Sequence, residues 1–126
     1  MKRASSLAIF IAVAACVTPA WAQDDHKGEQ VFRPCRACHA IGPGAKNKSG
    51  PELNGIVGRK AASVPGFIYS DAMKQAAAKG LVWTESNLTQ YLESPDTFLP
   101  NGVMPFAGIK NEADLKDLIA FLKKQK

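Results

Sequence analysis

Two cysteines and a histidine stand close together near the start of the chain. Cys35 and Cys38 are separated by two residues, and His39 follows the second cysteine directly. Thiols at this spacing can form a disulfide, a redox dithiol, half of a zinc site, or two thioether bonds to a haem whose iron the histidine then binds. These three residues are therefore the first candidates for chemistry.

The rest of the sequence favours the haem alternative. A disulfide across two residues closes a very small loop and adds little chain-entropy stabilisation. A thioredoxin-like dithiol should follow a strand in a βαβ unit, and no such pattern is present. Zinc needs two further Cys or His ligands, and beyond residue 22 the chain adds only His26. The pattern C-x-x-C-H predicts one haem c, bound covalently through Cys35 and Cys38.

The group that occupies the second face of a haem iron decides whether the protein binds small ligands or transfers electrons. Candidate ligands for it are His26, Met73 and Met104. His26 lies near the terminus, and Met73 lies among alanines on a predicted helix, where we expect it to pack. Met104 lies in a loop between two prolines, 65 residues after His39 and on a separate arm of the chain. We expect Met104 to reach the opposite face of the haem.

The first 22 residues have the pattern of an export signal. A short positive start precedes an apolar run of eleven residues and an Ala-Trp-Ala site at 20–22. The run is shorter than the roughly 18 residues that a transmembrane helix requires. The pattern predicts a cleaved signal peptide over residues 1–22 and a periplasmic domain over residues 23–126. A lipoprotein cut before Cys16, with a lipid anchor on that cysteine, is the alternative.

The charge of the chain limits its classes of partner. The formal net charge is +5 at pH 7, and removal of residues 1–22 takes away two basic residues and no acidic one, leaving +3. This mild charge suits transient docking to an acidic protein face and excludes a nucleic-acid-binding stripe. We expect a monomer without a nucleic-acid partner.

Helix start and stop signals predict an all-α domain with long loops. No stretch alternates long enough to demand a sheet. Caps and apolar periodicity predict helices from about Asp25 to Phe32, from Ser70 to Lys79, from Thr84 to just before Pro95, and after Asn111. Four modest helices leave the domain short of core, so we expect it to need an internal scaffold.

Residues 24–125 resemble the class I cytochromes c. The resemblance is carried by CRACH, by SGPELNGIVGRKAASVPGFIYSDAMK, and by LVWTESNLTQYLESPDTFLPNGVMPFAGIKNEADLKDLIAFLKK. These segments are similar to the mitochondrial protein and to its soluble counterparts in respiring and photosynthetic purple bacteria. The resemblance implies the cytochrome c fold, about four helices and long loops wrapped around one covalently bound haem, with the first and last helices crossing.

The resemblance also implies a ligand set. By position, Cys35 and Cys38 form the thioethers, and His39 and Met104 are the axial ligands. The carbonyl of Pro51 matches the group that accepts the ring N–H of His39, and an iron-bound imidazole needs such a partner on its other nitrogen.

Five further residues match positions around the haem in this family. Arg59, Tyr69 and Trp83 match residues that contact the haem propionates, which need donors when they are buried. Tyr91 matches the tyrosine near the methionine sulfur, and Phe106 matches the ring that shields the haem edge.

Three departures from the mitochondrial pattern stand out. Pro34 costs the first helix an N–H, so we expect this helix to end early or to kink. Asp96, Thr97 and Val103 replace lysines, which thins the positive ring around the exposed haem edge. Met73 stands where an asparagine is common.

These features predict a diffusible one-electron carrier rather than an enzyme. The partners we expect are membrane redox complexes: a quinol–cytochrome c oxidoreductase, a terminal oxidase or a photosynthetic reaction centre. Two alternatives are a haem enzyme or gas-binding sensor in which Met104 is displaced, and a thiol oxidoreductase without haem.

Overall fold

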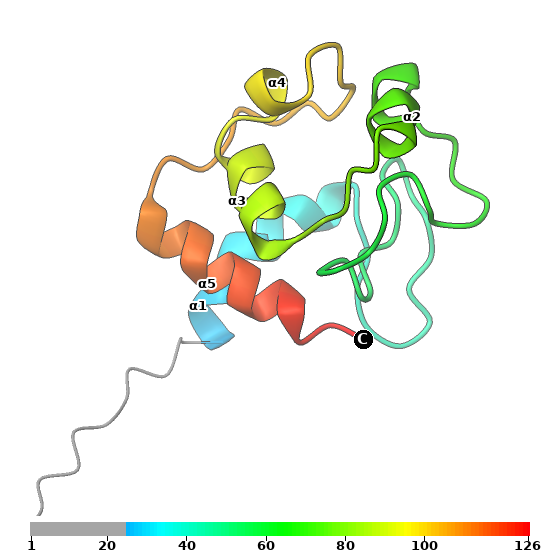
Figure 1. The fold of residues 1–126 in the computed structure, drawn as a ribbon. Helices are drawn as coiled ribbons and strands as arrows, with labels where there is room; N and C mark the ends of the chain where they lie inside the picture. Colours follow the sequence, from blue (N-terminus) through cyan, green and yellow to red (C-terminus); the bar gives the residue numbers. More distant parts are fainter. Residues whose placement is uncertain (1–24) are drawn as a thin grey trace, which may run out of the picture.

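The computed structural model describes residues 25–126, and the predicted signal peptide, its cleavage site and Cys16 lie outside the described residues. Within this range the chain is helical and contains no strand; one isolated bridge joins Lys60 and Val82. The elements are α1 (Asp25–Phe32), the 3₁₀ helix η1 (Arg33–Ala37), α2 (Asp71–Ala78), α3 (Glu85–Glu93), α4 (Pro95–Phe98) and α5 (Glu112–Lys123) (Figure 1). No helix in this range is long and apolar enough to cross a membrane.

The predicted helix caps are confirmed. Ser70, Thr84 and Asn111 precede α2, α3 and α5, and each side chain accepts a hydrogen bond from a backbone N–H two or three residues further on. Such caps satisfy donors that have no partner inside the helix. After α2, Gly80 takes a φ of 92°, the left-handed conformation in which glycine commonly ends helices.

A proline stands at the start of each of two short helices. The α-helical part of the first helix ends at Phe32 and continues as η1, with Pro34 at the start of the tighter helix. This is the early end expected from Pro34. Pro95 starts the short helix α4, which the sequence did not reveal, because proline is well suited to the first turn of a helix.

Helices α1 and α5 cross at a glycine. A Cβ atom on Gly28 would lie against the Asp117 carbonyl oxygen and 2.5 Å from Cβ of Phe121, so only glycine lets the two backbones approach this closely. Beside the crossing, the rings of Phe32 and Phe121 lie 5.7 Å apart. In Figure 1 the first and last helices of the described chain cross at this point.

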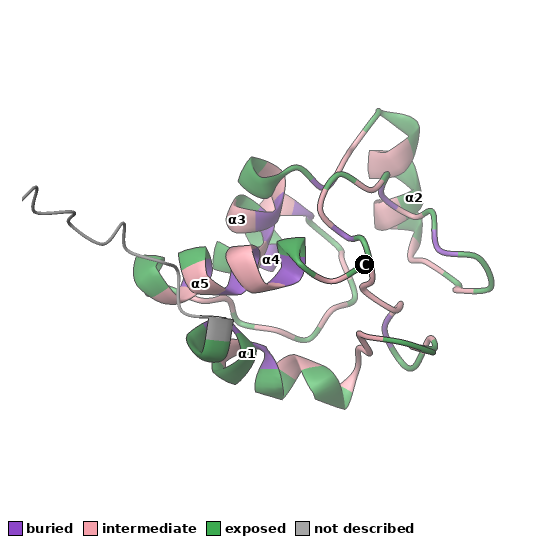
Figure 2. Ribbon diagram, turned by 90° about the horizontal axis from the view of Figure 1, so that it is seen from below, coloured by how far each residue is buried: buried purple, intermediate pink, exposed green. Residues whose placement is uncertain are grey.

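The buried hydrophobic residues lie on α1, α3 and α5 and at several points of the loops (Figure 2). The connected core comprises Phe32, Ile56, Ala61, Trp83, Leu88, Tyr91, Leu99, Leu118, Ile119 and Leu122. Helix α3 packs on both α4 and α5, and the loops between η1 and α2 and between α4 and α5 close the remaining sides. The helices therefore form one wall of a cavity, and the two long loops form the others.

Candidate functional site

An apolar cavity of about 470 Å³ lies between the helices and the long loops. Its size falls in the range of pockets that hold small molecules and cofactors. All ten site residues expected from the sequence line it: Cys35, Cys38, His39, Pro51, Arg59, Tyr69, Trp83, Tyr91, Met104 and Phe106. Met73 lines it as well, whereas His26 lies exposed on α1, hydrogen-bonded to Gln30.

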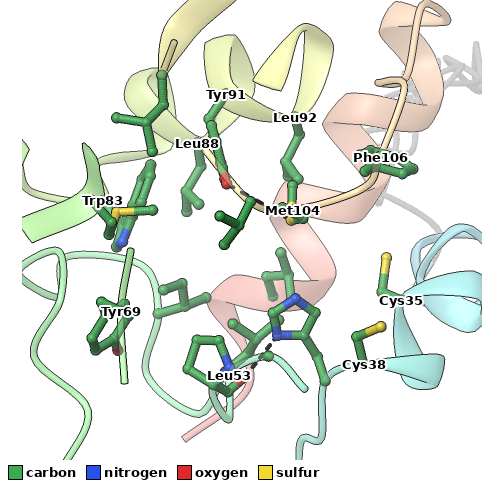
Figure 3. A pocket seen from close by; sticks show the side chains of 18 of the residues that line it. Cys35, Cys38, Leu53, Tyr69, Trp83, Leu88, Tyr91, Leu92, Met104 and Phe106 are labelled. Atoms are coloured by element: carbon green, nitrogen blue, oxygen red, sulfur yellow. Dashed lines mark hydrogen bonds between the residues drawn. The ribbon is translucent and has the colours of Figure 1, made fainter. Parts of the chain in front are cut away.

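The two cysteines lie side by side on one wall of the cavity, at the end of η1 (Figure 3). Neither thiol is in a disulfide. The N–H groups of Cys38 and His39 both donate to the Cys35 carbonyl, at 3.1 and 2.9 Å, so this turn fixes all three residues relative to one another. Burial raises the pKa of the Cys35 thiol, which is the opposite of what a nucleophilic redox thiol needs.

His39 has the tautomer that an iron ligand requires. Its Nδ1 lies 2.7 Å from the Pro51 carbonyl oxygen, and because a carbonyl only accepts, Nδ1 carries the proton. In the neutral ring the lone pair then belongs to Nε2. Burial lowers the pKa of His39, and the charges of Lys48 and Arg59 add to this effect, whereas the Pro51 hydrogen bond opposes it. The ring is therefore kept neutral with Nε2 available as a ligand.

Gly50 fixes the plane of the His39 ring from behind, and the sequence did not single it out. A Cβ atom at this position would lie 2.5 Å from Cε1 and 2.8 Å from Nδ1 of His39, so the glycine backbone lies directly on the ring. The Gly50 N–H also donates to the Cys38 carbonyl at 2.9 Å. In the sequence, only the position of Gly50 directly before Pro51 could have pointed to this contact.

Met104 enters the cavity from the loop between α4 and α5, on an arm separate from that of His39 (Figure 3). The Tyr91 hydroxyl donates to its sulfur at 3.8 Å. Burial, with a smaller contribution from Asp96, raises the pKa of Tyr91 to about 12, so the hydroxyl keeps the proton that it donates. This hydrogen bond uses one lone pair of the thioether and leaves the other available.

Polar donors gather on the far side of the cavity from the cysteines, where Figure 3 shows Tyr69 and Trp83. The Tyr69 oxygen accepts from the Val64 N–H at 3.1 Å, which leaves its own proton to donate. The Trp83 ring packs on that of Tyr91, with centroids 4.9 Å apart. Arg59 uses three of its five N–H donors within the protein. This side of the cavity can therefore bind acidic groups.

The donor set fits a covalently bound haem. The cavity supplies two thiols on one wall, an imidazole nitrogen with a free lone pair, and a thioether sulfur on a separate loop. The apolar lining suits a porphyrin ring, and the donors opposite the cysteines suit its carboxylates. An all-α domain with this cavity is a c-type haem protein.

Comparison with known proteins identifies the family. A family model described as cytochrome c matches residues 26–126. Cytochrome c2 of Blastochloris viridis is 50% identical over 111 residues, covering 88% of this chain and 85% of that protein. Cytochrome c-550 of Ancylobacter novellus is 56% identical over 97 residues, covering 77% and 91%. The solved structure of cytochrome c2 from Rhodospirillum centenum matches with a TM-score of 0.75 at 39% identity, covering 80% of this chain and 97% of that one.

The chain belongs to the cytochrome c family. It has the cytochrome c fold, carries one haem c bound covalently through Cys35 and Cys38, and is a haem electron carrier rather than an enzyme. The predicted fold class, cofactor and function are confirmed by this membership.

Proposed function

We propose that this chain is a periplasmic one-electron carrier in which His39 and Met104 are the axial ligands of the haem iron. The observation that carries the proposal is that the two residues come from separate arms of the chain and line the same cavity as Cys35 and Cys38. The Pro51 carbonyl orients the imidazole and Tyr91 orients the thioether. With two protein ligands, the iron would have no open position for a substrate, and this absence is expected of an electron carrier.

The haem, when bound, supplies an Fe(III)/Fe(II) couple that accepts and returns one electron. The contribution of the chain is to set the potential of this couple and to exclude water. A thioether ligand favours the reduced iron, and an apolar cavity disfavours the extra positive charge of the oxidised iron. Both effects raise the potential. Because Pro51 and Tyr91 hold His39 and Met104 in place, these two side chains would need to move little when the haem gains or loses an electron.

The remaining site residues have supporting roles in this proposal. Arg59, Tyr69 and Trp83 bind the haem propionates, since a carboxylate removed from water needs hydrogen-bond donors. Phe106 shields the haem edge, and its half-buried ring lines the cavity beside the methionine loop. The haem edge beside the methionine loop, where Val103 and Phe106 line the cavity, is the route for the electron.

The partners are membrane redox complexes that dock transiently at this edge. We infer a quinol–cytochrome c oxidoreductase as donor, with a terminal oxidase or a photosynthetic reaction centre as acceptor, and the names cytochrome c2 and c-550 of the relatives support this. The protein works as a monomer and needs no nucleic acid. Export by the signal peptide ends in cleavage after residue 22. The mass of the mature protein tests this: a chain starting at Gln23 supports it, and a lipidated Cys16 contradicts it.

Absorption spectra of the purified protein, oxidised and reduced, test the ligand set. His39 and Met104 ligation predicts a low-spin spectrum with the sulfur-to-iron charge-transfer band in the oxidised form. Met104→Ala should abolish this band and lower the midpoint potential, whereas Met73→Leu should preserve both. Binding of carbon monoxide by the reduced native protein would instead support a gas-binding protein in which Met104 is displaced.

A further inference from the structure

Glu52 directly follows Pro51, and all of its hydrogen-bonding groups have partners. One carboxylate oxygen lies 3.2 Å from Nη1 of Arg59, and the other accepts the Asn54 N–H at 2.7 Å. The Glu52 carbonyl accepts from Nη2 of Arg59 at 3.0 Å, and the Glu52 N–H donates to Oδ1 of Asn47 at 2.9 Å. The residue is therefore held through both its side chain and its backbone.

The ion pair between Glu52 and Arg59 is the least exposed of the ion pairs seen in residues 25–126. The side chains of Arg59 and Glu52 are 17% and 22% exposed, respectively, whereas both partners of every other pair are at least 46% exposed. Nη1 of Arg59 also donates to the Asn54 carbonyl at 2.9 Å. A guanidinium that binds a carboxylate and two carbonyls with little access to solvent is a rigid clamp, weakly screened by salt.

The peptide unit between Pro51 and Glu52 connects this clamp to His39. A peptide unit is planar, so the Pro51 carbonyl and the Glu52 N–H move together. The carbonyl accepts the Nδ1 proton of His39 at 2.7 Å, and the N–H on the other side of the unit donates to Asn47. A rotation of this peptide unit that turns the carbonyl away from His39 therefore also breaks the bond to Asn47 and pulls on the residue that Arg59 holds.

We propose that Glu52 is a positioning residue for His39 and a regulator of the haem potential. It clamps the peptide unit that orients the imidazole, and its carboxylate balances the charge of Arg59 in the cavity wall. The inference rests on the proposed role of His39 as an iron ligand. A neutral side chain at position 52 leaves the Arg59 charge uncompensated, and a positive charge near the haem favours the reduced iron.

The test compares the holoprotein with its Glu52→Gln and Glu112→Gln variants. Glu52→Gln should shift the ratio of reduced to oxidised protein by about threefold at a fixed solution potential, which is about 30 mV upward at 59 mV per tenfold. It should also speed hydrogen exchange at Nδ1 of His39, followed by NMR in the reduced protein. Glu112→Gln removes the same charge from an exposed pair with Lys116 and should change neither quantity. An unchanged midpoint and unchanged exchange in Glu52→Gln would overturn the proposal.

A second variant separates the charge from the clamp. Glu52→Asp keeps the carboxylate but is too short to hold both Arg59 and the Asn54 N–H. We expect a midpoint close to that of the original protein and faster exchange at His39, and unchanged exchange would overturn the positioning role even if Glu52→Gln fails to fold. If the original protein lacks the spectrum of His39 and Met104 ligation, the proposed function fails. If that spectrum is present and the Glu52 variants change nothing, the role of Glu52 alone fails.

Discussion

The Tyr91 hydroxyl donates a hydrogen bond to the sulfur of Met104 at 3.8 Å, across two segments that are thirteen residues apart in sequence. Tyr91 lies on α3, whose position is fixed by packing on α4 and α5. The methionine loop has no helix of its own, so this contact ties its ligand to the rigid part of the fold. The protein itself therefore holds the thioether in place, without help from a metal.

We predict that Tyr91→Phe loosens Met104. Sulfur is a weak acceptor, so we expect a loss of about 0.5–1 kcal/mol in the free energy of holding the ligand. Imidazole added to the oxidised protein should then displace Met104 with about two- to fivefold higher apparent affinity, measured by the loss of the charge-transfer band. Tyr69→Phe, which removes a hydroxyl elsewhere on the cavity wall, serves as the control. Equal imidazole affinity in both variants would contradict the role of the contact.

We predict that Gly50→Ala displaces the His39 ring. The new Cβ atom would lie 2.5 Å from Cε1 of the ring, which the Nδ1 hydrogen bond to Pro51 holds in place. We expect a loss of about 1–3 kcal/mol in the free energy of unfolding, together with a changed low-spin spectrum. Denaturant titration of the holoprotein measures the first, and absorption measures the second.

Gly44→Ala is the matched control for this change. A Cβ atom at Gly44 meets nothing within 4 Å, but the residue has a φ of 73°, so the substitution costs backbone strain alone. We expect a cost of about 1 kcal/mol and an unchanged spectrum. A spectral change in Gly44→Ala as large as that in Gly50→Ala would show that contact with the ring is not the cause.

The elements that sequence predicted well are those defined by local chemistry. Ser70, Thr84 and Asn111 mark helix starts because their side chains bond to a backbone N–H within the next turn. Pro34 marks the end of the α-helical part of the first helix for the same kind of reason. By contrast, α4 has only four residues, too few for any apolar period, and was not predicted.

Two residues that support the site, Gly50 and Glu52, could not be predicted, because their contacts depend on how the loop between η1 and α2 folds. Gly50 and Glu52 look like ordinary loop residues, and their contacts with His39, Arg59 and Asn47 exist only once the loops are folded. The ten expected site residues were found through the haem motif and the family resemblance, and the structure places them all on one cavity. Their individual roles stay predictions until ligand replacement tests them.

We predict that Gly28→Ala destabilises the fold without changing the haem spectrum. The added Cβ would press on the Asp117 carbonyl oxygen and on Cβ of Phe121, which pushes α1 away from α5. Overpacking costs about 1–3 kcal/mol, against which alanine recovers up to about 1 kcal/mol of helix propensity. We expect a lower midpoint of thermal unfolding and an unchanged redox midpoint. Lys27→Ala, at the exposed neighbouring position, should stay within about 0.5 kcal/mol of the original protein.

We predict that Val103→Lys makes electron transfer more dependent on salt. Val103 is 77% exposed, directly precedes Met104 and lines the cavity. A lysine there adds positive charge at the proposed docking edge, and attraction between exposed charges weakens as ionic strength rises. Oxidation of the reduced protein by an oxidase with an acidic docking face should therefore become faster at low salt and fall more steeply as salt is added.

Ile68→Lys controls for net charge in this experiment. Ile68 is 91% exposed but does not line the cavity, so the substitution adds the same charge outside the cavity lining. If the edge around Val103 docks the partner, Ile68→Lys changes the salt dependence much less than Val103→Lys. Equal slopes for the two variants would mean that overall charge, rather than the edge around Met104, steers the encounter, because only a local effect distinguishes two exposed lysines that add the same charge.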